Sequence, residues 1–411
     1  MYESKKNSII ILGKEGYFVK IMSINCGSSS LKFSLFEMDN KELIASGYFE
    51  KVTQEGSFFN IKYNGEKIYE EVEMPNHTVA VEVLLDRLVK LGIVDSLEEI
   101  GAIGHRLVHG ADKYNKSVII TDEVVEDLRI YSELAPLHNP ANILGIEAVK
   151  AVLPNVLMVG VFDTAFHQTM EPTQYMYPVP YEWYTNYKIR KYGFHGTSHC
   201  YISKQIPNLI GTDNYKAIIC HLGSGGSLSA VKDGKCVDTS MGFTPLPGIM
   251  MGTRSGDIDP SIVSFVAAKE NRSADEVVND LNKKAGFLGL SGKSNDFRDV
   301  YQGVLDGDER CKLAVDKYVK TVVDYIAMYY VELGGIDVLC FTAGLGENAI
   351  PVREMICDKL ACLGIKIDKE KNNTRGELVE LSVADSKARV FVVPTNEELM
   401  IAEDTYELIN K

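Results

Sequence analysis

Three short loops built from small residues have a composition that can bind phosphate groups. They are Asn25–Ser30, Gly223–Ser227 and Gly344–Asn348. Backbone N–H groups and hydroxyls in such turns can hold anionic oxygens without a helix N-terminus. Lys32 follows the first loop and lies on the same face of a predicted strand as Ser30, so its ammonium can reach the same phosphate. None of the loops matches the P-loop or the dinucleotide-binding pattern.

Two arginines stand among small residues in loops. Arg106 lies in the segment Gly104–Gly110, and Arg254 lies in Met251–Asp257. An arginine in this setting is suited to bidentate capture of a carboxylate or a phosphate. For either arginine taken alone, a solvated side chain is an equal alternative.

An aspartate and several histidines are further candidates for chemistry. Asp163 ends an apolar strand, where a carboxylate is either a helix N-cap or a catalytic or metal-associated group. His195 and His199 have i, i+4 spacing, but the HExxH zinc pattern is absent. We therefore expect His195 to donate a hydrogen bond to a phosphoryl oxygen. Burial in the core is the alternative for His199 and His221.

The elements that must position these residues alternate between short β-branched runs and longer helical patterns, which predicts an α/β fold. The predicted strands are Val19–Ile24, Leu31–Glu37, Ala102–Ile103, Val156–Phe162, Ala217–His221, Leu228–Val231, Val338–Thr342 and Val390–Val393. The predicted helices are Thr78–Leu91, Asn142–Val152, Pro260–Lys269 and Lys312–Leu333. Asp259 is expected to cap the third helix, and a capping box at Thr395–Glu398 is expected to open a C-terminal helix.

A weak internal repeat indicates two similar domains. Ile24–Leu35 can be aligned with Cys220–Val231, so that Gly27 falls on Gly223. Each copy reads as a strand, a small-residue turn and a second strand. Two such hairpins are consistent with two related domains that face one nucleotide.

Composition excludes several classes of protein. The chain has 411 residues, 45% of them hydrophobic and 24% charged, which is typical of a globular protein of two or three domains. The net charge of −14 argues against nucleic-acid or anionic-membrane binding. No apolar run approaches the roughly 20 residues of a membrane helix. Eight dispersed cysteines without a CxxC pattern are expected to be reduced, which favours a cytoplasmic location.

Several ordered motifs resemble those of the acetate kinase (acetokinase) family, from about Lys20 to the C-terminus. The motifs are Asn25–Lys32, Gly104–Gly110, Phe162–His167, Tyr192–His199, Asp238–Pro260, Gly344–Asn348 and Pro394–Glu398. The resemblance implies two actin-like (ribonuclease H-like) domains of duplicated βββαβαβα topology with an active-site cleft between them. The implied domains are residues 20–165 plus 397–411 and residues 166–396, with residues 1–19 as an N-terminal extension. The resemblance also implies a homodimer. The implied reaction is reversible, direct in-line transfer of a phosphoryl group from ATP to acetate, with Mg²⁺ or Mn²⁺.

The resemblance also implies a role for each candidate residue. Arg106 would bind the carboxylate substrate, and Asp163, His195 and Arg254 would be catalytic. Asn25 and Glu397 would lie near the metal ion. The nucleotide would be held by Lys32, His221, Leu222, Gly223, Ser224, Gly225, Asp296, Phe297, Arg298, Gly344, Leu345, Gly346, Glu347 and Asn348. Since a carboxylic acid is already ionised at pH 7, we expect Asp163 to orient other groups more than to abstract a proton.

One departure from the family pattern concerns the nucleotide loop. Ser224 stands where the family usually has asparagine, so one side-chain contact to phosphate is weaker or runs through water. Backbone N–H groups of Gly223, Gly225 and Gly226 are expected to cradle the phosphate in its place. A different phosphoryl donor, such as pyrophosphate, is the alternative.

Two other functions are compatible with such a fold. An ATP-dependent chaperone or switch would need a peptide-binding module, and no segment remains for one. A propionate or butyrate kinase is the closer alternative, because one methylene changes binding by only roughly 1–3 kcal/mol.

Overall fold

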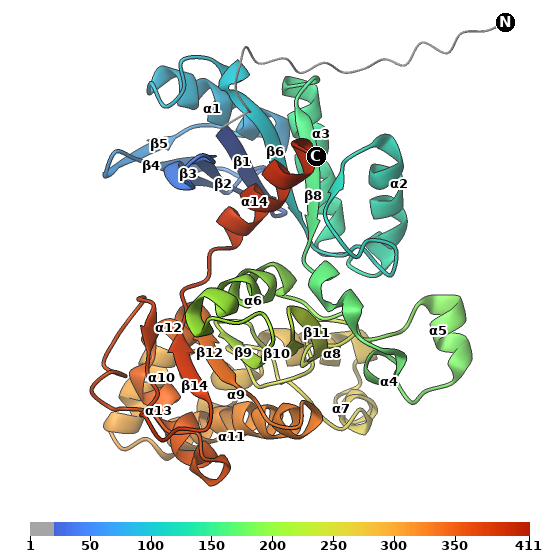
Figure 1. Ribbon diagram of the computed structural model, residues 1–411. Helices are drawn as coiled ribbons and strands as arrows, with labels where there is room; N and C mark the ends of the chain where they lie inside the picture. The colour runs from blue at the N-terminus through green and yellow to red at the C-terminus, as the bar shows by residue number, and fades with distance from the viewer. Residues whose placement is uncertain (1–19) are drawn as a thin grey trace, which may run out of the picture. The chain divides into compact units, whose positions relative to one another are not determined.

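The structure is a computed structural model that describes residues 20–411 (Figure 1). The N-terminal extension expected at residues 1–19 lies outside the described residues. The chain divides into two compact units. The first contains residues 20–107, 117–161 and 401–411, and the second contains residues 108–116 and 162–400. Residues 108–116, 162–165 and 397–400 therefore belong to the second unit, whereas the sequence analysis placed them in the first domain.

The first unit is built on an eight-stranded sheet of order β5-β4-β3-β2-β1-β6-β8-β7. Its strands are β1 (Lys20–Cys26), β2 (Ser30–Glu37), β3 (Glu42–Glu50), β4 (Phe58–Tyr63), β5 (Glu66–Glu71), β6 (Ile100–Leu107), β7 (Val118–Ile119) and β8 (Leu157–Phe162). The first five strands form an antiparallel meander, and β1 pairs in parallel with β6.

The helices of the first unit are α1 (His77–Lys90), α2 (Asp122–Ile130), α3 (Asn139–Val152) and the end of α14 (Glu397–Ile409). Helix α1 starts where the Asn76 side chain accepts a hydrogen bond from the Val79 N–H. Its buried residues Ala80, Leu84 and Leu88 recur at helical spacing, which gives α1 one apolar face. Asn76 and this periodicity together explain why the segment is helical.

The second unit repeats the same plan in a six-stranded sheet of order β11-β10-β9-β12-β14-β13. Its strands are β9 (Lys216–Leu222), β10 (Gly226–Lys232), β11 (Lys235–Thr239), β12 (Val338–Thr342), β13 (Val379–Glu380) and β14 (Arg389–Val392). Strands β9–β11 form an antiparallel meander, and β9 pairs in parallel with β12, as β1 does with β6. The repeat predicted from the two hairpins is confirmed.

Helices pack on both faces of the second sheet, with α11 (Glu309–Glu332) on one face and α6 (Gly196–Ile210) on the other (Figure 1). The other helices of this unit are α4 (Pro172–Tyr175), α5 (Tyr181–Tyr187), α7 (Ser261–Glu270), α8 (Ala274–Lys283), α9 (Gly286–Ser291), α10 (Phe297–Leu305), α12 (Ala343–Asn348) and α13 (Ile350–Leu360). Along β9, Ile218 and Cys220 belong to a core cluster with α11, while Ala217 and Ile219 belong to one with α6. This alternation is what a strand buried on both faces produces.

Three local expectations need correction. Helix α7 begins at Ser261, after Pro260, although the Asp259 side chain does accept a hydrogen bond from the Ser261 N–H. Helix α14 is capped by Asn396, which accepts from the Leu399 N–H, because the Thr395 hydroxyl is bonded to Ser198 instead. Residues 343–348 form a short helix, not an open loop.

All eight cysteines lie within residues 20–411 and are free thiols, as expected. No helix in that part of the chain is long and apolar enough to span a membrane.

Candidate active site

In the first unit, a tight turn brings Asn25 and Lys32 together. The Gly27 N–H donates to the Ser30 carbonyl at 2.9 Å, and Asn25 lies directly opposite Lys32 in the β1–β2 ladder. Opposed residues of an antiparallel pair point to the same face. An amide oxygen and an ammonium are therefore presented side by side next to the turn.

Two residues that the sequence analysis missed hold this turn. The His77 Nε2 atom lies 2.8 Å from the Gly27 carbonyl oxygen, and the Asn142 side-chain amide donates to the Cys26 carbonyl at 3.2 Å. These partners come from α1 and α3, far away in the sequence. No local pattern marks them.

Arg106 lies near the end of β6 in the same unit and is half-buried. Its neighbour His105 is buried in the core, and this burial lowers the pKa of His105 to about 3. His105 is therefore neutral at physiological pH, and the only formal charge in this pair is on Arg106.

In the second unit, Asp163 anchors the backbone at the start of α6. Its carboxylate accepts hydrogen bonds from the His195 N–H at 3.0 Å and from the Thr197 hydroxyl at 3.3 Å. Its carbonyl accepts the Gly196 N–H at 2.9 Å. A Cβ on Gly196 would lie 2.1 Å from that carbonyl oxygen, so glycine is required there. The carboxylate at a helix N-terminus is favourable electrostatically.

These contacts hold His195 in an unusual backbone conformation. His195 has φ +58°, in the left-handed region that non-glycine residues seldom occupy. Such strain persists only where the surroundings enforce it, and it is common at functional sites. Asp163 is thus placed to orient His195.

The side chains of His195 and Arg254 approach the same point of the glycine-rich loop Gly223–Ser227. A Cβ on Gly225 would lie 3.2 Å from Arg254 Nη1 and 3.5 Å from His195 Nε2. The absence of a side chain at Gly225 therefore leaves room beside both groups. Burial lowers the pKa of the Arg254 guanidinium, but its usual value is so high that it stays charged.

The backbone of this loop differs in part from expectation. The Gly223 N–H donates to the Gly225 carbonyl at 3.0 Å, so it is used inside the loop and is not available to a phosphate. The Ser224 carbonyl accepts the Gly252 N–H at 2.9 Å, which fixes the loop against the Arg254 segment.

His221 and Glu347 belong to one chain of hydrogen bonds. His221 Nδ1 lies 2.8 Å from Ser198 Oγ, which lies 2.8 Å from Thr395 Oγ1. The Thr395 N–H donates to Glu347 Oε1, which also accepts the Ala343 N–H at 2.7 Å. These two predicted nucleotide-binding residues therefore connect β9, α6 and α12.

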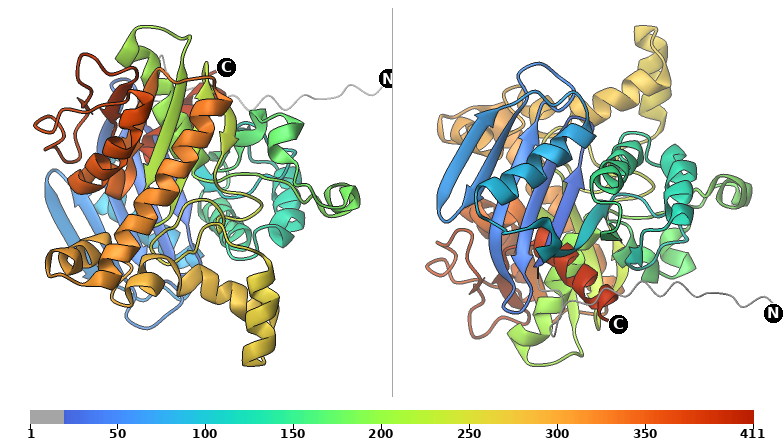
Figure 2. Two further views of the ribbon diagram at one scale, coloured as in Figure 1. Left: turned by 90° about the horizontal axis from the view of Figure 1, so that it is seen from below. Right: turned by 90° about the horizontal axis from the view of Figure 1, so that it is seen from above.

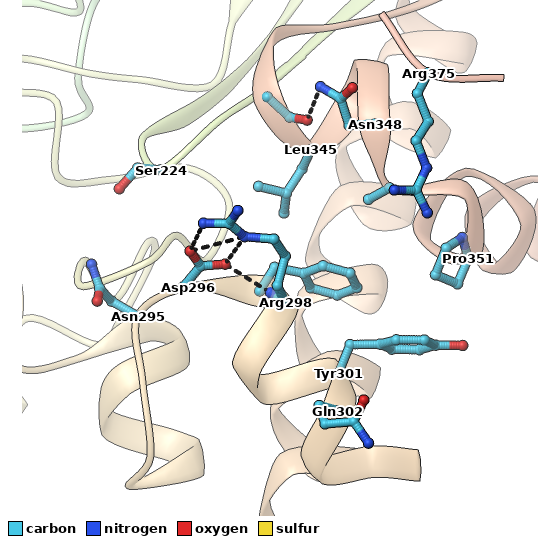
Figure 3. A pocket seen from close by; sticks show the side chains of 13 residues that line it. Ser224, Asn295, Asp296, Arg298, Tyr301, Gln302, Leu345, Asn348, Pro351 and Arg375 are labelled. Atoms are coloured by element: carbon cyan, nitrogen blue, oxygen red, sulfur yellow. Dashed lines mark hydrogen bonds and ion pairs between the residues drawn. The ribbon is translucent and has the colours of Figure 1, made fainter.

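A cavity of about 630 Å³ opens beside the loop in the second unit (Figure 3). Its size is within the usual range for small-molecule sites. The residues that line it are Ser224, Asn295, Asp296, Phe297, Arg298, Tyr301, Gln302, Gly344, Leu345, Asn348, Ala349, Pro351 and Arg375. Figure 3 shows the bidentate ion pair between Arg298 and Asp296 beside Leu345 and Ser224.

Only part of the predicted nucleotide set lines this cavity. Ser224, Asp296, Phe297, Arg298, Gly344, Leu345 and Asn348 do, whereas His221, Leu222, Gly223, Gly225, Gly346 and Glu347 do not. Lys32 belongs to the first unit. Tyr301 and Gln302 were missed, although they follow Arg298 by three and four residues on α10 and helical spacing could have found them.

Arg353 supports the floor of the cavity and was also missed. It is fully buried and donates to the carbonyls of Gly346, Glu347, Asn372 and Thr374 at 2.8–3.0 Å, and to Asn372 Oδ1 at 2.8 Å. Burial lowers its pKa to about 10. It connects α12, which lines the cavity, to the segment before Arg375.

Residues 20–411 contain no group of three or more histidine, cysteine, aspartate or glutamate side chains arranged to hold a metal ion. Mg²⁺ in kinases is commonly held by one or two protein oxygens together with substrate phosphates. Asn25 in the first unit offers an amide oxygen and Glu397 in the second unit a carboxylate, and each is a donor of the type that Mg²⁺ accepts.

Two sheets with the same duplicated plan and a nucleoside-sized cavity beside a glycine-rich hairpin define a protein with the actin-like fold. The family model of the acetokinase family matches residues 20–403, and the chain belongs to this family.

Named relatives agree with this assignment. The chain is 54% identical to the acetate kinase of Desulfitobacterium hafniense over 398 residues, which are 96% of this chain and 100% of the relative. The crystal structure of Porphyromonas gingivalis acetate kinase superposes with a TM-score of 0.92 at 44% identity, over 95% of this chain and 99% of that one. A propionate kinase from Francisella tularensis gives a TM-score of 0.88 at 42% identity, over 94% and 98% of the two chains.

Proposed function

We propose that this protein is an acetate kinase, which reversibly transfers the γ-phosphoryl group of ATP directly to acetate to give acetyl phosphate and ADP. One geometric observation within the second unit supports the proposal. Ser224 lines the nucleoside-sized cavity, and the next residue, Gly225, lies against Arg254 and His195. A nucleotide whose base occupies the cavity would deliver its terminal phosphate to this cationic corner.

The reaction requires positioning and charge stabilisation more than proton transfer. A carboxylate is ionised at pH 7 and must approach a polyanion. In the proposed mechanism, Arg106 binds the substrate carboxylate. His195 and Arg254 donate hydrogen bonds to the equatorial oxygens of the transferring group. Asp163 acts as a catalytic-site residue by holding the His195 backbone, since its carboxylate already accepts two hydrogen bonds there.

A divalent metal, Mg²⁺ or Mn²⁺, is part of the proposal. When bound, it supplies charge neutralisation on the nucleotide phosphates. Asn25 and Glu397 would contact it, and Lys32, next to Asn25, would hold a phosphate oxygen.

The second candidate function is a propionate kinase, which differs in the carboxylate that accepts the phosphoryl group. The Francisella tularensis neighbour is named a propionate kinase, and an apolar cluster adjoins His195 in this chain. The cluster contains Val108, Phe194, Met241 and Met251. We place acetate first because the relatives above 50% identity are named acetate kinases.

The test is ATP-dependent acyl-hydroxamate formation from acetate, propionate and butyrate measured side by side. We expect kcat/KM to be highest for acetate. A higher kcat/KM for propionate or butyrate would reassign the substrate, and no product from any of the three would contradict the proposal.

We further propose a cytoplasmic homodimer. The free state of all eight thiols supports a reducing compartment. Helix α7 carries Ile262 and Phe265 exposed and has no buried residue, and the α7–α8 pair extends away from the rest of the second unit (Figure 2). A helix with apolar residues and no buried face is suited to cover by a second copy. Light scattering should give twice the 45.6 kDa chain mass, and Phe265→Glu should reduce it to one chain.

A further inference from the structure

Three histidines and a buried serine form a network around the proposed phosphoryl site. The Ser227 hydroxyl lies 2.9 Å from His195 Nδ1 and 2.8 Å from His199 Nε2. Ser227 and His199 are both fully buried. The His221 ring stacks on His195 with centroids 4.1 Å apart.

A hydroxyl has one proton, so Ser227 cannot donate to both rings. It could accept from both, but its own buried O–H would then have no acceptor, since the two histidines are its only side-chain partners among residues 20–411. Two arrangements remain. In one arrangement it donates to His195 Nδ1 and accepts from the Nε2–H of His199. In the other arrangement it donates to His199 Nε2 and accepts from the Nδ1–H of His195. The two arrangements place the proton of a neutral His195 on different nitrogens.

The position of the proton on the His199 ring distinguishes the two arrangements. Burial lowers the pKa of His199 well below its ordinary value, so the ring is neutral and carries one proton. Its Nδ1 atom is buried and has no hydrogen-bond partner among residues 20–411. The second arrangement would place the proton on Nδ1, as a buried N–H without an acceptor, and such groups are rare in folded proteins. The first arrangement leaves only a lone pair there.

We propose that Ser227 and His199 are positioning residues that fix His195 as the Nε2–H tautomer. The His199 Nε2–H donates to Ser227, the Ser227 hydroxyl donates to His195 Nδ1, and the proton of His195 lies on Nε2. That atom is the one beside the Gly225 position and Arg254. The relay therefore presents a neutral N–H donor, next to a guanidinium, to an oxygen of the transferring phosphoryl group.

This inference rests on the proposed function for its catalytic consequence, but the tautomer can be measured without turnover. In the protein labelled with ¹⁵N at histidine, ¹⁵N NMR distinguishes protonated from unprotonated ring nitrogens, and a His195→Gln variant assigns the signals. We expect His195 to be protonated at Nε2 alone. Protonation at Nδ1, or at both nitrogens, would overturn the proposal, whatever the activity.

Ser227→Ala tests the relay, and Ser229→Ala is its matched control. Ser229 is on the same strand, is equally buried and is bonded to Thr239 at 3.1 Å, not to a histidine. We expect Ser227→Ala to mix the two tautomers and to lower kcat at least tenfold, with KM for ATP within about twofold. An unchanged tautomer, or an equal loss of kcat in Ser229→Ala, would refute a positioning role.

A second pair of variants keeps the test independent of folding. His199→Gln places an N–H donor near the Nε2 position, whereas His199→Leu has none. We expect His199→Gln to retain most of the kcat and His199→Leu to behave like Ser227→Ala. Equal kcat in the two variants would contradict the relay. If the wild type shows the Nε2–H tautomer but no ATP–acetate activity, the proposed function fails and the assignment of the proton stands.

Discussion

At the scale of single residues, Arg254 places a positive charge beside Gly225. It is half-buried, and its Nη1 donates to the Pro245 carbonyl at 3.3 Å, which fixes the guanidinium beside Gly225. In a site with little water, a fixed cation acts more strongly on developing charge than it would in solution.

Arg254→Ala should therefore lower kcat by about 10³-fold and change KM for ATP by less than about threefold. We expect the loss in kcat because the guanidinium lies beside Gly225, where the proposed mechanism puts the transferring group, and does not line the nucleoside cavity. Steady-state kinetics in the acetyl phosphate-forming direction measures both constants. Arg129→Ala, at an exposed ion pair with Glu147 in the first unit, should leave both unchanged. A rise in KM with kcat intact would assign Arg254 to ground-state binding.

Ser224 is the second residue whose effect can be stated. Its carbonyl accepts the Gly252 N–H, and the residue lines the cavity with a short side chain. One neutral hydrogen bond contributes roughly 0.5–1.5 kcal/mol. Ser224→Asn should thus change KM for ATP by at most about tenfold, with a similar kcat. The same assay with ATP, GTP and pyrophosphate should show ATP as the best donor. Activity with pyrophosphate but not with ATP would overturn the assignment of the cofactor.

Residue types with strong intrinsic chemistry could be proposed for the site from the sequence, whereas the residues that support them could not. Arg254 and His195 stand among glycines and aromatics that mark a ligand site. Ser227, Arg353 and His77 are ordinary in their local sequence, and their importance comes from partners 19 to 50 residues away or on other elements. Packing decides their roles, and packing is not visible in local spacing.

At the scale of elements, the strands and the two hairpins were predictable because alternation and small-residue turns are local signals. The helix at Ala343–Asn348 was missed because its glycines favour a turn. The structure stabilises it with Glu347, which accepts the Ala343 N–H, and with Arg353 beneath it. Tertiary contacts here override a weak intrinsic propensity.

At the scale of elements, the contacts of Arg353 predict what happens when its side chain is removed. Arg353→Ala leaves several buried carbonyls without a donor, and each such group costs about 1–3 kcal/mol. We expect a clear fall in melting temperature and a rise in KM for ATP of at least about tenfold, with KM for acetate within about twofold. One loosened element is α12, which lines the cavity, and the other is the segment that leads to Arg375, which also lines it. Arg389→Ala, at a partly exposed pair with Glu380, is the control. Equal changes in the two KM values would contradict the local role.

At the scale of the whole molecule, the duplicated plan explains why the sequence pointed to two units but misplaced segments near their boundaries. The strand–turn–strand repeat is encoded twice, once in each sheet. The chain crosses between the units in several places, and residues 108–116 join the second unit. Within that unit, the His109 ring packs against Tyr192 at 4.4 Å. A contact across more than eighty residues leaves no trace in composition.

Three buried histidines make the free energy of unfolding fall as the pH is lowered. Burial lowers the pKa of His105 to about 3 and the pKa values of His109 and His167 to about 4. In the unfolded chain these groups titrate near 6.5. Between those limits the unfolded state binds more protons, so the free energy of unfolding is highest above about pH 6.5 and falls as the pH drops toward 4. Asp238 opposes this trend, since burial raises its pKa.

Differential scanning calorimetry at about pH 7 and pH 5 should therefore show a lower melting temperature at pH 5, where ordinary carboxylates are still mostly ionised. His105→Phe removes one such group and keeps a ring in the core. At pH 5 a histidine that stays neutral in the fold costs about 2 kcal/mol, which corresponds to roughly 4–8 °C for a unit of this size. The acid-induced drop should be smaller by that amount in His105→Phe than in the wild type. An identical drop in the two proteins would mean that His105 is protonated in the folded state. The assignment of His105 as a neutral, buried residue beside Arg106 would then be wrong.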